Sequence, residues 1–290
     1  MTAGDGVGVG KVFHYSIGKI GVHQRVYILS NFKCDGKYLY YYFSSRFYDR
    51  VKRLSAKNSV DSVRMEMITE MPLSLPSLEE QSKIGRLLSL LDERITTQNK
   101  IIEKLETLIK GIGDFFLKDS TLVGKWVRLG DICQITTGKL DANAMVEGGV
   151  YPFFTCAEKP FCINDYAFDT EALLVSGNGA NLGYINYYKG RFNAYQRTYV
   201  LDKFTENIQF VKFVLKVFLP QRIAIEKSTS NTPYIVLSTL SDMKIFIPSE
   251  STQQRIVNLM LNFETNIAIQ TSLLVNYNKL KSYLLQQMFI

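Results

Sequence analysis

The chain has 290 residues, of which 46% are hydrophobic and 21% are charged, and this balance indicates a folded protein of more than one domain. The formal net charge of +7 favours a polyanionic partner, most often nucleic acid, with an anionic membrane surface as the alternative. No run of about 20 apolar residues exists, which excludes a membrane-spanning helix, and no secretory signal pattern is present. The four cysteines lack metal-site spacing, so we expect free thiols in a reducing cytoplasm.

A glycine-rich run, Gly4–Lys11, opens the chain and superficially resembles a phosphate-binding loop. That pattern requires a glycine where Asp5 stands and a hydroxyl residue where Val12 follows the lysine, so we reject a nucleotide site. A short strand pattern at 11–15, a glycine turn and a second strand pattern, His23–Leu29, come next. The glycine run is therefore interpreted as the loop of a hairpin, in which glycine supplies a positive φ.

An aromatic run and a long helix follow in the chain. The run Tyr38–Phe43 is continuous and apolar, which predicts a buried element rather than a base-stacking platform. Ser77 and Glu80 have the spacing of a capping box, and a helix is predicted over 79–116. At about 1.5 Å per residue, such a helix of about 38 residues would be about 57 Å long. Its apolar residues recur in steps of three and four, and Gln98 fills the single gap, as in the seam of a coiled coil. The seam comprises Ile84, Leu88, Leu91, Ile95, Ile102, Leu105, Ile109, Ile112 and Phe116.

Two motifs in the second half of the sequence bear on function. Tyr151–Phe154 is another aromatic run for which we expect burial. Asn231–Tyr234 resembles the Asn/Asp-Pro-Pro-Tyr/Phe motif of DNA amino-methyltransferases, but Thr232 replaces the first proline and no glycine-rich S-adenosylmethionine loop precedes it. We predict a polar turn there. Neither histidine belongs to a recognisable catalytic or metal-binding constellation, so the sequence indicates no catalytic site.

The chain contains an internal repeat. The segments that begin at Leu75 ("LPSLEEQ") and Ile247 ("IPSESTQ") share one register at an offset of 172 residues, which also relates "HQRVYIL" to "YQRTYVL". The opening run matches "GNGANLGY", Gly177–Tyr184, at an offset of 173. Each copy is predicted to be an α/β segment followed by a long helix, and the second copy starts near Trp126. Met1 corresponds to about residue 174, so we expect the first copy to lack roughly the first 50 residues of a full unit.

The second long helix repeats the seam, with Gln270 at the position equivalent to Gln98 and Lys281 as a further departure. If the two helices pack antiparallel, the two glutamines face each other, and we hypothesise that the pair marks a pseudo-twofold axis and fixes the register. The alternative is that each helix is buried separately in its own globule. The apolar seam of the second helix comprises Ile256, Met260, Phe263, Ile267, Leu274, Tyr277, Leu284 and Met288.

The repeated Pro-Ser segment with its glutamine and long helix resembles the two spacer regions of type I restriction–modification specificity subunits. "WVRLGDICQITTGK", Trp126–Lys139, is similar to the start of their target-recognition domains. The resemblance implies mixed α/β (α+β) recognition domains joined by two long helices that pack as an antiparallel coiled coil. The implied boundaries are a partial first recognition domain at 1–76, a spacer helix at 77–119, a second recognition domain at 120–248 and a second spacer helix at 249–290.

The resemblance also implies a function. Each domain reads one part of a split site on double-stranded DNA, and the helices set the gap between the parts. The chain itself has no catalysis and no cofactor; S-adenosylmethionine belongs to a methyltransferase (modification) subunit, and ATP and magnesium to a motor-nuclease (restriction) subunit. The complex is expected in the cytoplasm of a prokaryote, away from membranes. A homodimer, in which two copies supply two complete second domains, is a further expectation on symmetry grounds.

Features shared by both copies, such as Gln24-Arg25 and Gln196-Arg197, favour structural or backbone-contact roles, because phosphate contacts carry no sequence information. We expect base contacts in three polar loops of the second copy, at 136–139, 178–181 and 227–232, with first-copy counterparts at 5–11 and 57–62. An ordinary solvated turn is the alternative for each loop. The candidate DNA-contacting residues are Lys11, Arg25, Lys57, Asn58, Thr136, Thr137, Lys139, Asn178, Asn181, Arg197, Lys227, Ser230 and Asn231.

A protein of a different class remains the competing hypothesis, namely a coiled-coil scaffold that organises partners without recognising DNA. The two hypotheses differ in the salt dependence of DNA binding, which is strong when phosphates are contacted.

Overall fold

A computed structural model describes residues 1–6, 8–55, 62–118, 123–227 and 234–289, and for 114, 116–118 and 227 it describes the backbone without the side chain. The chain forms two compact units. Unit 1 comprises Met1–Lys104 and Ile267–Ile290, and unit 2 comprises Leu105–Asn266. The long helices α3 (Leu78–Lys118) and α6 (Glu250–Met288) contribute residues to both units, and both lie within three residues of the predicted bounds. Each unit is described by itself below.

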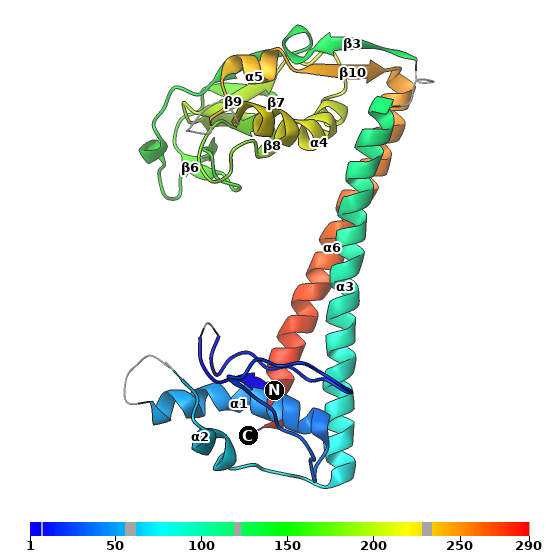
Figure 1. Ribbon diagram of the computed structural model, residues 1–290. Helices are drawn as coiled ribbons and strands as arrows, with labels where there is room; N and C mark the ends of the chain where they lie inside the picture. Colours follow the sequence, from blue (N-terminus) through cyan, green and yellow to red (C-terminus); the bar gives the residue numbers. More distant parts are fainter. Residues whose placement is uncertain (7, 56–61, 119–122, 228–233, 290) are drawn as a thin grey trace. The chain divides into compact units, whose positions relative to one another are not determined.

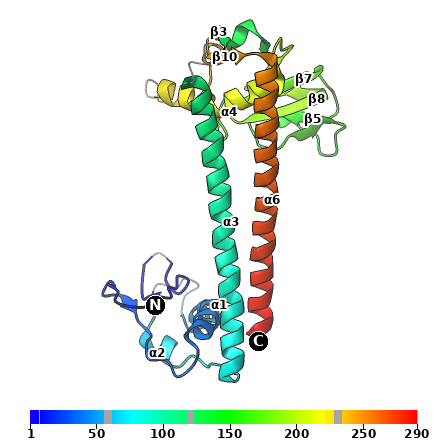
Figure 2. The ribbon, with the colours of Figure 1, turned by 90° about the vertical axis from the view of Figure 1, so that its right-hand side faces the viewer.

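Unit 2 is built on a six-stranded sheet with the strand order β4-β9-β7-β8-β5-β6. All neighbouring pairs are antiparallel except β5 and β8. In Figure 2 the strands β7, β8 and β5 follow one another across this sheet. A separate pair, β3 and β10, forms a two-stranded ribbon. The strands are β3 (Gly124–Arg128), β4 (Gln134–Thr137), β5 (Tyr151–Phe154), β6 (Phe161–Ile163), β7 (Phe168–Ser176), β8 (Ile185–Ala194), β9 (Thr198–Asp202) and β10 (Lys244–Pro248).

Helices and short turns cover this sheet. Because side chains alternate along a strand, Leu173 and Val175 of β7 enter the main core with α4, whereas Ala172 and Leu174 face a second cluster around Phe192. The predicted burial of the aromatic run in β5 is confirmed, since Phe153 and Phe154 are almost fully buried. The remaining elements of unit 2 are η1 (Leu129–Asp131), η2 (Ala142–Ala144), α4 (Ile208–Lys227), α5 (Leu237–Ser241), residues 105–118 of α3 and residues 250–266 of α6.

Unit 1 consists of β1 (Thr2–Ala3), β2 (Val26–Tyr27), α1 (Gly36–Leu54), α2 (Met65–Thr69), residues 78–104 of α3 and residues 267–288 of α6. The aromatic run Tyr38–Phe43 lies in α1, where Tyr38 and Tyr41 are buried against Leu88 and Phe289, so its predicted burial is confirmed. The strand prediction for 11–15 is wrong, because these residues form just an isolated bridge between Thr2 and Phe13. The second predicted strand, at 23–29, is reduced to the two residues of β2.

The start of α3 follows the predicted capping box. The backbone N–H of Glu80 is 3.3 Å from Ser77 Oγ, and the backbone N–H of Ser77 donates to Glu80 Oε2 at 3.0 Å. Every described seam position is buried or half-buried, whereas most of the positions between them are exposed. In unit 1, α3 and α6 lie side by side (Figure 1), and the Gln98 side-chain amide donates to Gln270 Oε1. Lys281, the other seam departure, forms an ion pair with Asp92.

The internal repeat is confirmed at the level of individual hydrogen bonds. In each half, a buried glutamine near the start of the long helix accepts a hydrogen bond from the backbone at the start of the preceding helix. In each half, a tyrosine hydroxyl also donates to a backbone carbonyl 36 residues later in the sequence. The matched bonds are Asp35 N–H to Gln81 and Asn207 N–H to Gln253, Tyr27 Oη to Val63 O and Tyr199 Oη to Ile235 O, and Gly4 N–H to Arg25 O and Gly177 N–H to Arg197 O.

Candidate nucleic-acid interface

Two of the three predicted loops of unit 2, together with Arg197, meet at one edge of the large sheet. Strand β4 ends, β9 begins and β7 ends at this edge, because Thr137 pairs with Tyr199 and Ser176 pairs with Thr198. The edge therefore carries the 136–139 segment, Arg197 before β9, and the 178–181 loop after β7. The antiparallel order β4-β9-β7 produces this convergence, and residues about 60 positions apart in the sequence become neighbours.

Glycines make the close approach of these segments possible. A Cβ added at Gly177 would lie 2.5 Å from Arg197 O, and one added at Gly138 would lie 1.9 Å from Ala194 O. These two glycines therefore allow segments of the chain's own backbone to approach each other closely. Gly179 differs, because it has a φ of +79° and no described atom within 4 Å of an added Cβ. The turn at Gly179 is the open part of the loop.

The two asparagines of the 178–181 loop have different surroundings. The Asn181 side-chain amide donates to Cys156 O at 3.0 Å, so Asn181 fixes the loop against the segment that follows β5. Asn178 is half-exposed and makes no side-chain hydrogen bond within the described residues. The segment after β5, with exposed Glu158 and Lys159, is part of the same edge and was not predicted. A short charged loop between two aromatic strands was the signal for it.

Exposed cations on this edge have no acidic partner among the residues that the structure describes. Arg197 and Lys139 are exposed, and neither forms an ion pair within the part of the chain that the structure describes. Thr136 is half-exposed and Thr137 is exposed beside them. An edge with hydroxyl groups, an amide and free cations offers the donors that phosphate oxygens and base edges accept.

In unit 1, the arginine equivalent to Arg197 is neutralised by a carboxylate of the same unit. Arg25 Nη1 donates to Asp5 Oδ2, and this hydrogen bond, together with the charge of Asp5, raises the pKa of Arg25 above its ordinary value. Asp5 occupies the position that Asn178 holds in the second copy. Lys11 lies 4.4 Å from the centroid of the Tyr48 ring, a cation–π distance. The two copies therefore share a backbone framework but differ in the electrostatics of the loop.

The remaining candidates fall on residues outside the described part of the chain. These are Lys57, Asn58, Ser230 and Asn231, together with the side chain of Lys227; the polar turn predicted at 231–234 is described at Tyr234 alone. The described residue Ile235 donates its N–H to Gly177 O at 2.8 Å, so the chain after the 227–232 loop returns to the same sheet edge. Among the described residues no cluster of side chains suited to hold a metal ion is found. No described helix is long and apolar enough to cross a membrane.

Comparison with known proteins identifies the family. The profile of the type I restriction modification DNA specificity domain matches residues 2–107 and 124–276, so one match falls on each copy of the repeat. The chain belongs to this family. It is 43% identical over 129 residues to the type I restriction enzyme EcoDI specificity subunit of Escherichia coli. The aligned residues cover 44% of this chain and 28% of that protein.

A second relative covers more of the chain. The type I restriction enzyme MjaIX specificity subunit of Methanocaldococcus jannaschii is 25% identical over 265 residues, which covers 77% of this chain and 61% of that protein. The chain thus spans less than two thirds of the length of these curated relatives. A crystal structure of the type I restriction–modification S subunit from M. genitalium has the same fold, with a TM-score of 0.64 and 19% identity over 89% of this chain and 73% of that one.

Proposed function

We propose that the chain is a DNA sequence-specificity subunit of a type I restriction–modification complex, in which each repeat reads one part of a split DNA site. The observation that carries this proposal is the match of both repeats to the family, combined with the edge of unit 2 where Thr137, Asn178 and Arg197 lie together. Arg197 and Lys139 on this edge have no acidic partner among the described residues. Free cations would hold the phosphate backbone, and the hydroxyl and amide groups would contact base edges.

The chain would supply recognition and no catalysis. Methylation of adenine would be carried out by methyltransferase subunits that bind S-adenosylmethionine, and restriction by a motor-nuclease subunit that uses ATP and magnesium. Membership of the family supports these partners and a location in the prokaryotic cytoplasm. The helices α3 and α6 would pack as an antiparallel coiled coil along their seams, and the covered seam positions support this arrangement. Association of two copies remains a prediction, which sedimentation of the purified chain would test.

Genome-wide mapping of methylated adenine tests the proposal. The chain is co-expressed with a type I methyltransferase subunit, and methylated sites are mapped by sequencing. We expect one split motif. A variant with Thr137→Ala, Asn178→Ala and Arg197→Ala should lose or relax one half of the motif, whereas Arg25→Ala, at the equivalent position of the other copy, should leave that half unchanged. An assembled complex that methylates no motif would contradict the proposal and favour a coiled-coil scaffold.

A further inference from the structure

Asn178 is the one asparagine in the sequence that a glycine follows. Asparagine is among the thermolabile residues, and in an Asn-Gly pair the glycine nitrogen can attack the side-chain amide, because glycine has no side chain to obstruct the approach. In a folded protein this reaction is favoured when the attacking N–H has no hydrogen bond and the side-chain amide is not held by other groups. The loop 177–180 meets both conditions.

The peptide group between Asn178 and Gly179 is open. Within the described residues, neither the Gly179 N–H nor the Asn178 side chain makes a hydrogen bond. Gly179 is exposed, with a φ of +79° and no described atom within 4 Å of an added Cβ. Asn181 in the same loop differs, because its amide donates to Cys156 O at 3.0 Å and the half-buried Leu182 follows it. Asn178 is therefore the reactive asparagine of this loop.

The first copy of the repeat shows what a carboxylate at this position does. Asp5 corresponds to Asn178, and the glycine that follows each of them has a φ of +79°. The Asp5 carboxylate accepts a hydrogen bond from Arg25, whose counterpart in unit 2 is Arg197. Unit 1 thus contains the arrangement that unit 2 would acquire if the amide of Asn178 became a carboxylate.

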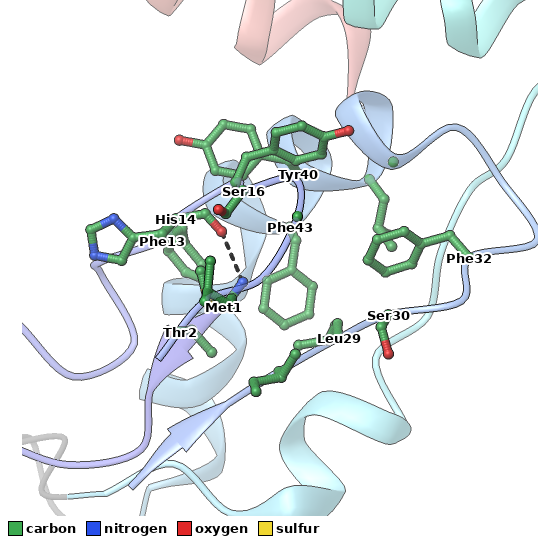
Figure 3. A pocket seen from close by; sticks show the side chains of 16 residues that line it. Met1, Thr2, Phe13, His14, Ser16, Leu29, Ser30, Phe32, Tyr40 and Phe43 are labelled. Carbon is green, nitrogen blue, oxygen red and sulfur yellow. Dashed lines mark hydrogen bonds between the residues drawn. The ribbon is translucent and has the colours of Figure 1, made fainter. Parts of the chain in front are cut away.

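The backbone around the two loops has the same hydrogen bonds. In each copy, the glycine before the loop residue donates its N–H to the carbonyl of the matched arginine at 2.8 Å. Its own carbonyl accepts an N–H, from Val63 in unit 1 and from Ile235 in unit 2. In unit 1 the chain ahead of Asp5 is held further, because the nitrogen of Met1 donates to His14 O at 2.9 Å (Figure 3). A carboxylate at position 178 would therefore reach its arginine as Asp5 does.

We propose that Asn178 is a deamidation site, and that the carboxylate produced there neutralises Arg197. The Gly179 nitrogen forms a bond with Asn178 Cγ, the Cγ–Nδ2 bond breaks, and ammonia leaves with the proton that the Gly179 N–H gives up. Water then opens the cyclic imide at either carbonyl, so the net change is the addition of water and the loss of ammonia. The product is aspartate or isoaspartate, and each places a negative charge beside Arg197. The effect of this charge on DNA binding rests on the proposed function.

Ageing of the full chain tests the chemical step. The purified chain is incubated in mildly alkaline buffer, which favours loss of the amide proton, and its proteolytic fragments are weighed by mass spectrometry at intervals. We expect Asn178 to convert while Asn181 stays an amide. Gly179→Ala should convert about ten-fold or more slowly, because a methyl group beside the attacking nitrogen raises the barrier. An isolated peptide of residues 173–184 is the reference for an unprotected Asn-Gly pair. If the peptide converts and the folded chain does not, the proposal is overturned.

The reactivity of Arg197 reports its neutralisation without DNA. Phenylglyoxal modifies unpaired guanidinium groups fastest, so in the fresh chain Arg197 should react about two- to five-fold faster than Arg25, as expected for one exposed ion pair. After ageing, and in Asn178→Asp, Arg197 should react as slowly as Arg25. Asp5→Asn is the matched control, since it should make Arg25 react as fast as Arg197 does in the fresh chain.

DNA binding is measured on the same samples. The affinity of the ageing chain for a random-sequence duplex should fall towards that of Asn178→Asp, whereas the affinity of Gly179→Ala should stay constant over the same time. If the fresh chain binds no DNA but Arg197 still loses reactivity on ageing, the deamidation inference is supported and the proposed function is contradicted. Conversion of Asn178 with unchanged reactivity of Arg197 would overturn the inference, because the new carboxylate would then not neutralise the arginine.

Discussion

At the residue scale, one exchange distinguishes the two loops of the repeat. Asp5 pairs with Arg25 in unit 1, whereas Asn178 leaves Arg197 without an acidic partner among the described residues of unit 2. A cation that is already paired gains less from a phosphate, because the existing ion pair must be broken first. If both loops face DNA, the second copy should therefore provide more of the electrostatic affinity.

Reciprocal substitutions test this contrast. Asn178→Asp should weaken binding to a random-sequence duplex, and Asp5→Asn should strengthen it, each by about two- to five-fold, since an exposed pair is worth up to about 1 kcal/mol. Fluorescence anisotropy over a series of salt concentrations is the measurement, and Asn178→Ala is the control for loss of the amide. The salt slope should fall by about one charge for Asn178→Asp. Equal slopes for Asn178→Asp and Asn178→Ala would show that Arg197 does not contact phosphate.

A second residue-scale prediction concerns two glycines of α3. A Cβ at Gly85 would lie 3.0 Å from the backbone N of Tyr38 and 3.0 Å from Asp35 Oδ1, at the N-cap of α1. At Gly111, no described atom lies within 4 Å of such a Cβ. Gly111→Ala should therefore stabilise the protein by about 0.5–1 kcal/mol through helix propensity. Gly85→Ala should forfeit that gain and destabilise, because the backbone of α1 must move. Thermal denaturation of the two variants side by side would refute this explanation if both are stabilised.

At the element scale, the two long helices were predictable and the strands of unit 1 were not. The seam and the capping box depend on residues three or four positions apart, so the local sequence determines which face of α3 is covered. Strands depend on neighbours that are distant in the sequence. In unit 2, β7 pairs with both β8 and β9, whereas in unit 1 the equivalent residues Thr2–Ala3 form a two-residue pairing, and the predicted strands around them are accordingly short or absent.

The glutamine pair gives the element-scale prediction. Gln98 is buried and its amide donates to Gln270, so replacing either residue by leucine leaves the remaining amide without its partner. Each single substitution should destabilise by about 1–3 kcal/mol. The double substitution, Gln98→Leu with Gln270→Leu, should cost less than the sum and can increase stability, because two apolar side chains then fill the seam. A double-mutant cycle from thermal denaturation measures the coupling. Additive effects of the two single substitutions would contradict a paired role.

At the scale of the whole molecule, the repeat was the part of the sequence that carried most information. It located equivalent loops, and equivalent hydrogen bonds confirm the alignment. It did not reveal that 136–139, 178–181 and Arg197 share one sheet edge, because the strand order β4-β9-β7 brings residues together without a local signal. The partners of Asn181 and Arg25 likewise lie far from them in the sequence and were not predicted.

The length of the two long helices gives a prediction for the whole protein. Because α3 and α6 both contribute residues to units 1 and 2, seven residues inserted into each should lengthen the spacer without changing either recognition unit. The insertions follow Lys104 in α3 and Asn266 in α6, and each repeats the preceding seven residues so that the seam continues. A heptad adds about 10.5 Å of helix, which corresponds to about three base pairs of duplex.

Methylation mapping of the lengthened protein should give the same two half-sites with a gap about three base pairs wider. Insertion into one helix alone is the control, because it mismatches the paired seams, and it should lower the melting temperature and abolish methylation. A lengthened protein that assembles with the proposed methyltransferase subunits and still methylates the original motif would show that the helices do not set the gap. Intact half-sites separated by a wider gap would instead mean that recognition resides in the loops and spacing in α3 and α6, so that either can change without the other.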